Sequence, residues 1–160
     1  TIIDMDTLKI GDHAPVFAAP RDGGGTISLA DHAGKPVVLY FYPKDDTPGC
    51  TKEAICFTEA AADFTALGAT VIGVSKDPVK KHDKFVAKYD LGIPLISDED
   101  GNVCENYGVW VEKSMYGKTY MGIERATYLI GADGKIAQIW RKVKVPGHVE
   151  AVLTALREQS

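Results

Sequence analysis

Cys50 is the residue of this sequence with the clearest signs of chemistry. It follows Thr47-Pro48-Gly49 at the point where a loop becomes a segment with a helical pattern, so Thr47 or a neighbour can cap the helix and Pro48 can begin it. The first amide groups of a helix have no intrahelical partner and carry partial positive charge. They stabilise a thiolate, which is the nucleophilic form of cysteine. The sequence therefore predicts a reactive thiol at Cys50.

An inert, buried cysteine that happens to begin a helix is the competing interpretation, because free cysteines are commonly buried. The loop before it favours the chemical interpretation. Pro43 and Pro48 restrict the backbone of the loop, and Thr47 places a hydroxyl three residues before the sulfur. Ligands of α/β sheets also bind beyond the carboxyl ends of central strands, where this loop begins.

The elements that must position Cys50 have the pattern of an α/β fold. We expect buried strands at 37–42 and 70–75, helices at 50–67 and 77–89, a peripheral strand at 93–97, a short helix at 102–107, a hairpin of 125–130 with 135–140, and a terminal helix at 146–156. Asp77 and Pro78 are the expected cap and first residue of the second helix. Residues 112–124 favour no single assignment, and residues 1–25 suggest an extended lead-in. The order predicts a thioredoxin-like fold with a central mixed β-sheet flanked by helices, as one domain over residues 1–160.

Composition limits the classes of function. A net charge of −4, without long basic runs, argues against a nucleic-acid partner. No apolar run approaches the roughly 20 residues that a membrane span needs, and the first residues lack a leader pattern, so we expect a cytoplasmic protein. Three cysteines are an odd number, which disfavours a disulfide framework. We expect no metal and no cofactor, since clustered ligands and a phosphate loop are missing from the sequence.

The loop at 41–51 resembles the active-site loop of the peroxiredoxins, in which the pattern Pro-x-x-x-Thr/Ser-x-x-Cys falls on Pro43, Thr47 and Cys50. Its flanks resemble the peroxiredoxin Q branch, also called bacterioferritin comigratory protein. Further matches lie at 11–17, 95–101, 107–110, 118–120 and 125–130, so the resemblance covers nearly the whole chain.

The resemblance implies an antioxidant thiol peroxidase that reduces hydrogen peroxide and organic hydroperoxides. Cys50 would attack the peroxide and become a sulfenic acid, with Thr47 bonding the substrate, Arg125 holding the negative charge and Pro43 shielding the sulfur. Taken alone, Arg125 is also compatible with a surface arginine paired to Glu124. The implied partners are a hydroperoxide and thioredoxin or a similar dithiol reductant, and the implied assembly is a monomer or weak dimer.

The second cysteine of the reaction departs from the family pattern. The resolving cysteine of this branch often lies five residues after the first, where this sequence has Ile55, and Cys56 lies one residue later. In an intact helix the Cα atoms of positions i and i+6 are about 10 Å apart, which exceeds disulfide range. Cys56 can resolve Cys50 only if the first turns unwind, and a buried helix-face cysteine is the other interpretation.

Several alternatives remain open at this point. Cys104 is interpreted as structural, and if Cys56 is structural too, the protein is a one-cysteine peroxidase reduced by an external thiol. A thioredoxin-fold redox sensor or holdase chaperone could use the same Cys50 to pass oxidation to a partner. A cysteine hydrolase would need a nearby histidine, and we place none of the four histidines in a segment near the Cys50 loop. A dithiol oxidoreductase would need a Cys-x-x-Cys motif, which the sequence lacks.

Overall fold

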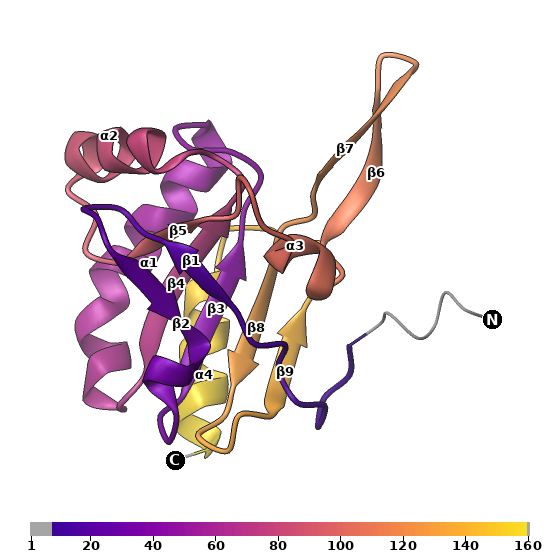
Figure 1. The fold of residues 1–160 in the computed structure, drawn as a ribbon. Coiled ribbons are helices and arrows are strands. Elements are labelled where there is room, and N and C mark those ends of the chain that lie inside the picture. The colour runs from indigo at the N-terminus through magenta and orange to yellow at the C-terminus, as the bar shows by residue number, and fades with distance from the viewer. Residues whose placement is uncertain (1–7, 160) are drawn as a thin grey trace.

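The centre of the protein is a mixed sheet of five strands in the order β5-β4-β3-β8-β9 (Figure 1). A computed structural model describes residues 8–159, so the predicted lead-in over residues 1–25 is described only from residue 8 onward. The strands are β3 Val37–Phe41, β4 Thr70–Ser75, β5 Leu95–Ser97, β8 Ala126–Ile130 and β9 Ile136–Trp140. β3, β4 and β5 run parallel, whereas β8 runs antiparallel to β3 and β9 to β8. This arrangement confirms the predicted fold class.

Helices and a small hairpin cover the two faces of the sheet (Figure 1). The helices are α1 Pro48–Ala66, α2 Val79–Tyr89, α3 Val103–Asn106 and α4 His148–Gln159. α1 and α4 lie side by side on one face, and the hairpin of β1 Ala18–Pro20 and β2 Thr26–Ser28 lies on the other with α3. A short 3₁₀ helix, η2 Leu29–His32, follows β2. Within residues 8–159, no helix combines the length and the apolar character that crossing a bilayer requires.

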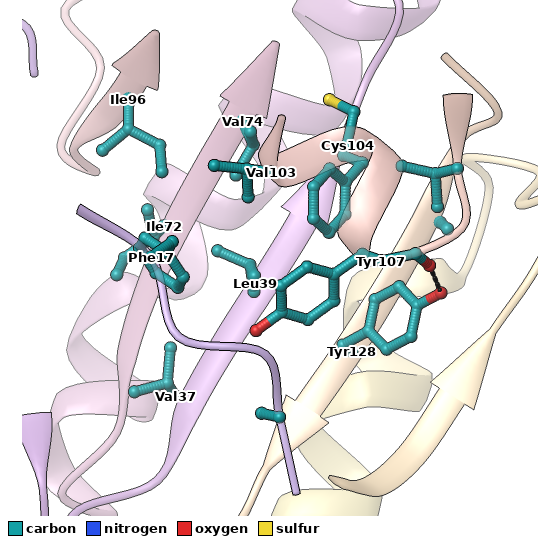
Figure 2. Close-up of a cluster of buried hydrophobic side chains, with 14 of the residues drawn as sticks. Phe17, Val37, Leu39, Ile72, Val74, Ile96, Val103, Cys104, Tyr107 and Tyr128 are labelled. Carbon is teal, nitrogen blue, oxygen red and sulfur yellow. Dashed lines mark hydrogen bonds between the residues drawn. The ribbon is translucent and has the colours of Figure 1, made fainter. Parts of the chain in front are cut away.

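All five residues of β3 are buried, because both faces of the sheet are covered. Val38 and Tyr40 point toward α1 and α4, and Leu39 points to the opposite side. Figure 2 shows this opposite side, where Leu39 and Tyr107 pack in a single apolar cluster. The sheet therefore separates two cores, and a side chain in one of them does not reach the other.

Residues 112–124, which the sequence leaves unassigned, form the hairpin of β6 Trp110–Met115 and β7 Lys118–Ile123. The hairpin extends away from the body of the molecule (Figure 1). Most of its side chains are exposed on both faces, so the strands lack the alternation of apolar and polar residues that marks a half-buried strand.

The start of α2 differs from the sequence prediction in one functional detail. Pro78 is the N-cap and Val79 the first helical residue, so Asp77 does not cap the helix. The Asp77 carboxylate instead accepts hydrogen bonds from Ser75 Oγ at 2.7 Å and from the Asp45 backbone N–H at 2.8 Å. Strand β5 begins directly after Pro94 and lies at the edge of the sheet, as predicted for the 93–97 segment.

Gly73 of β4 allows the sheet to pack closely, and its replacement should lower stability. A Cβ at Gly73 would lie 2.7 Å from Leu95 Cδ2 and 2.9 Å from the Tyr40 ring, and both of these side chains are fully buried. Gly73→Ala should lower the free energy of unfolding by about 1–3 kcal/mol, measured by urea denaturation.

Gly122→Ala is the matched control for this measurement. Its Cβ would meet the flexible end of Lys113 at 3.1 Å and the exposed Tyr120 ring at 3.4 Å, so we expect a change within about 0.5 kcal/mol. An unfolding midpoint of Gly73→Ala equal to that of the parent would contradict the packing described here.

Candidate active site

Cys50 lies in the first turn of α1, directly after the loop that leaves β3. Thr47 is the N-cap of the helix and Pro48 occupies its first turn, as the sequence predicts. The side chain is buried, with 2% of the residue exposed. Burial would make a charged sulfur costly, but the first-turn amide groups and the positive end of the helix compensate for it. The location therefore places the sulfur next to the partial positive charge of a helix N-terminus.

Arg125 provides the counter-charge to this sulfur. Its Nη2 donates a hydrogen bond to Cys50 Sγ at 3.3 Å. The sheet brings the two residues together, because Phe41 at the end of β3 pairs with Ala126 at the start of β8. The residue before β8 therefore lies beside the loop that follows β3. The alternative pairing of Arg125 with Glu124 is wrong, since Glu124 binds Arg141 instead.

Glu53 is the member of the site that the sequence interpretation missed. It is fully buried, and its Oε1 accepts a hydrogen bond from Arg125 Nη1 at 2.6 Å. Burial raises the pKa of Glu53 to about 7, against the opposing effect of Arg125. The sequence did contain a signal for Glu53. Residues i and i+3 of a helix share one face, and Glu53 lies three residues after Cys50.

Arg125 thus bridges a sulfur and a carboxylate with two nitrogens of one planar group. Burial acts to lower the pKa of Arg125. The charges of Glu53 and Cys50 and their hydrogen bonds outweigh this effect, so the pKa of Arg125 lies above its ordinary value. Gly49 makes room for this bridge, since a Cβ there would lie 3.1 Å from Arg125 Nη2. The guanidinium is therefore held in a fixed orientation beside the sulfur.

The other two predicted residues of the loop lie at its edge, and both are half-buried. Thr47 Oγ1 donates a hydrogen bond to the Lys44 carbonyl at 2.8 Å, rather than capping the helix with its side chain. This bond engages the hydroxyl proton, so the Thr47 oxygen is left to act as an acceptor toward a ligand. Pro43 begins the loop immediately after Tyr42 and has no backbone N–H to be satisfied.

Two histidines lie closer to the site than the sequence interpretation allowed. His82 Nδ1 is 2.6 Å from Asp45 Oδ2 in the active-site loop, so our placement of all four histidines away from that loop is wrong. His148 Nε2 is 2.7 Å from Thr127 Oγ1, and burial together with Arg125 lowers its pKa to about 4. Among the described residues, neither imidazole hydrogen-bonds the Cys50 sulfur, so the Cys-His pair of a hydrolase is not formed.

The remaining cysteines lie in different surroundings, and all three thiols are free. Cys56 is partly exposed on the unbroken helix α1, at the rim of a hollow between α1 and α4. Burial raises its pKa, and the charge of Glu59 adds to this effect. Cys104 is fully buried on the other face of the sheet (Figure 2), where burial and Asp98 raise its pKa strongly. The structure therefore does not bring either thiol to Cys50.

Relatives with known names cover most of this chain. The AhpC/TSA family matches residues 10–139. A curated protein named putative peroxiredoxin bcp, from Coxiella burnetii, is 51% identical over 94% of this chain and 99% of its own length. Peroxiredoxin Bcp from Escherichia coli K12 is 44% identical over 98% of this chain and 100% of its own length.

Solved structures agree with these relatives. A peroxiredoxin Q structure from Xanthomonas campestris superposes with a TM-score of 0.85 at 48% identity, and covers 89% of this chain and 90% of its own. A PrxQ mutant from Xylella fastidiosa gives a TM-score of 0.90 at 42% identity, covering 95% of this chain and 97% of its own. With a thiol, an arginine and a carboxylate assembled on this fold, the chain belongs to the AhpC/TSA family and is a peroxiredoxin of the Q/Bcp branch.

Proposed function

We propose that Cys50 is the peroxidatic residue of this peroxiredoxin and reduces hydroperoxides as a thiolate. The sulfur attacks the terminal peroxide oxygen, an S–O bond forms, and the O–O bond breaks. Cys50 becomes a sulfenic acid, and the other oxygen leaves as an alkoxide or hydroxide that takes up a proton to give an alcohol or water. The observation that carries this proposal is the 3.3 Å hydrogen bond from Arg125 to the Cys50 sulfur at a helix N-terminus.

Charge in this reaction moves from the sulfur to the leaving oxygen, so donors fixed along that path lower the barrier. Arg125 is such a donor, and Glu53 keeps its guanidinium from turning away. Thr47 faces the substrate as an acceptor for the O–H of the attacked oxygen, because the Lys44 carbonyl already takes its own proton. Pro43 shields the Cys50 sulfur from water on the side of the loop.

The substrates that we propose are hydrogen peroxide and alkyl hydroperoxides. The bacterioferritin comigratory protein of Xanthomonas campestris, 47% identical to this chain, has alkyl peroxide reduction activity. The nearly complete burial of Cys50 fits a substrate that offers a small terminal oxygen while its organic part stays outside.

Recovery of the thiol is proposed to use Cys56 and then an external dithiol such as thioredoxin. The Cys56 thiolate attacks the sulfenic sulfur, an S–S bond forms, and the S–O bond breaks; the oxygen leaves as hydroxide, which takes up a proton to give water. The dithiol of thioredoxin then reduces the disulfide to the two thiols by exchange and is itself oxidised to a disulfide. Since α1 is an unbroken helix from Pro48 to Ala66, its first turns must unwind for this step. Unwinding also removes the burial that raises the pKa of Cys56. The protein is proposed to work in the cytoplasm as a monomer or weak dimer.

The one-cysteine mechanism remains the second candidate. The intact helix between Cys50 and Cys56, and the position of Cys104 across the sheet, both favour direct reduction of the sulfenic acid by an external thiol. A sensor or chaperone that only relays oxidation would differ from both mechanisms, because it would not consume peroxide over many turnovers.

Three cysteine variants separate these mechanisms. Cys50→Ser should abolish peroxide consumption in an assay coupled to thioredoxin, thioredoxin reductase and NADPH. Cys56→Ser should still form a sulfenic acid at Cys50 but lose turnover with thioredoxin, because no disulfide can form. Cys104→Ser is the matched control, with turnover expected to equal the parent.

Parent-like turnover in Cys50→Ser would overturn the assignment of the peroxidatic residue. Parent-like turnover in Cys56→Ser would instead support the one-cysteine mechanism. After oxidation of the parent with one equivalent of peroxide, peptide mass mapping should show a Cys50–Cys56 disulfide.

Gly49→Ala should change stability and reactivity in opposite directions. Alanine is the better helix former, by about 1 kcal/mol, so the free energy of unfolding should not fall. Its Cβ would press on Arg125 Nη2, and the displaced guanidinium should slow oxidation of Cys50 by peroxide roughly 3- to 10-fold. Rapid-mixing oxidation kinetics and urea denaturation measure the two effects. A parent-like oxidation rate would contradict this account of Gly49.

Glu53→Gln should slow oxidation of Cys50 in a pH-dependent manner. The Glu53 carboxyl has a pKa of about 7, so its negative charge holds Arg125 fully only above that pH. Removing one charge-assisted bond should cost about tenfold in rate above pH 8. The rates of parent and variant should converge below pH 6, where the parent carboxyl is protonated. If the ratio of the parent rate to the variant rate stayed constant from pH 6 to pH 8, the charge of Glu53 would have no role in the oxidation of Cys50.

A further inference from the structure

A second buried cluster of charged groups holds the active-site loop, apart from the Cys50–Arg125–Glu53 group. At its centre is Asp45, which lies in the loop between Pro43 and Thr47 and is buried. Asp45 Oδ1 accepts a hydrogen bond from the Tyr42 hydroxyl at 2.5 Å, and Oδ2 lies 2.6 Å from His82 Nδ1. The loop is thereby tied to the end of β3 and to helix α2.

His82 is fully buried, and both of its ring nitrogens face acceptors. Nδ1 faces the Asp45 carboxylate, and Nε2 lies 3.0 Å from the Ile96 carbonyl oxygen of β5. A neutral imidazole has one N–H and one lone pair, so it can satisfy only one of these partners. Only the imidazolium donates to both, and a neutral ring would set a nitrogen lone pair against an oxygen.

The charged groups around His82 support the imidazolium form. Burial lowers the pKa of His82, but the hydrogen bond and charge of Asp45, the Ile96 carbonyl and the charge of Asp77 outweigh burial and raise it above its ordinary value. Asp77 lies on the connection from β4 to α2 and also accepts the Asp45 backbone N–H. Burial raises the pKa of Tyr42 well above its ordinary value, so its hydroxyl remains a donor to Asp45.

We propose that His82, as a buried imidazolium, is a positioning residue that fastens the active-site loop, through Asp45, to α2 and β5. The fastened loop presents Thr47 and Cys50 for attack on peroxide, so this inference rests on the proposed function of Cys50. The fastening stabilises the intact first turn of α1, and it opposes the unwinding that a disulfide with Cys56 requires. Loss of the imidazolium proton releases the loop.

The direction of the pH effect follows from linkage. A group whose pKa is higher in the folded protein contributes its full stabilisation below its unfolded pKa, about 6.5 for histidine. This contribution is lost as the pH rises through the folded pKa. The loop is therefore fastened in mildly acid solution and released at higher pH.

Two substitutions separate the role of the proton from the role of the contacts. His82→Gln cannot donate to both acceptors and should release the loop at every pH. Asp45→Asn should keep it fastened with a neutral imidazole, because the amide would donate to Nδ1 while Nε2–H donates to Ile96 and Tyr42 donates to the amide oxygen. Asp45→Asn should therefore remove the pH dependence without releasing the loop. His13→Gln, at an exposed histidine, is the matched control.

Amide hydrogen exchange of residues 44–51 measures the fastening without any peroxide. At pH 6, His82→Gln should exchange roughly 10- to 100-fold faster than the parent in this segment, the effect expected for a lost charge-assisted hydrogen bond. The parent should lose protection as the pH rises, after correction for the intrinsic exchange rate, whereas Asp45→Asn should keep it. Parent-like protection in His82→Gln, or a pH dependence retained in Asp45→Asn, would overturn the proposal.

Nitrogen-15 NMR of the histidine rings provides a test that does not depend on these variants folding. Both nitrogens of His82 should carry protons at pH 6.5, and the ring should titrate above the ordinary histidine pKa. A ring that is neutral at pH 6.5 would overturn the proposal. If His82 behaves as expected but peroxide does not oxidise Cys50 in the parent protein, the proposed function is wrong and the fastening of the loop by His82 still holds.

Discussion

The burial of the Cys50 sulfur beside the Arg125 guanidinium is the constraint on which this structure depends. With Cys50 only 2% exposed, water cannot solvate a thiolate, and the protein must supply the compensation itself. The first turn of α1 gives part of it, and Arg125 gives the rest through a 3.3 Å hydrogen bond. That arginine is in turn compensated by Glu53. The Arg125 guanidinium thus lies between the Cys50 sulfur and the Glu53 carboxyl group. Its bond to Glu53 holds it beside the sulfur.

The sheet brings these groups together. β3 ends where the loop begins, and its antiparallel pairing with β8 sets Arg125 beside that loop, although 75 residues separate Arg125 from Cys50. The loop is also held from its other side, where Asp45 contacts His82 and Asp77. Attack on peroxide needs this rigid arrangement, whereas a disulfide with Cys56 needs the first turns of α1 to open. In the cycle that we propose, the stability of the loop therefore sets the balance between attack on peroxide and formation of the disulfide.

Prediction from sequence succeeded where a local pattern had a single physical cause. The mainly apolar runs at 37–42 and 70–75 form the strands β3 and β4 inside the sheet, and the proline in the 93–97 segment correctly indicated an edge strand. Prediction failed for the β6–β7 hairpin, because a strand that is exposed on both faces does not need alternating apolar and polar residues. It also failed at Asp77, whose short carboxylate suits a helix cap but is used by Ser75 and Asp45.

The sequence by itself determined the place of Cys50 in the first turn of a helix, because Thr47 and Pro48 are residues that favour a helix start. It also determined the family, through motifs spread along nearly the whole chain. Only the tertiary structure decided what that thiol contacts. Glu53 as the partner of Arg125, His82 as the support of the loop, and the separation of Cys104 from Cys50 all depend on strand register and on which face a helix buries. These are long-range properties, and no local pattern of residues encodes them.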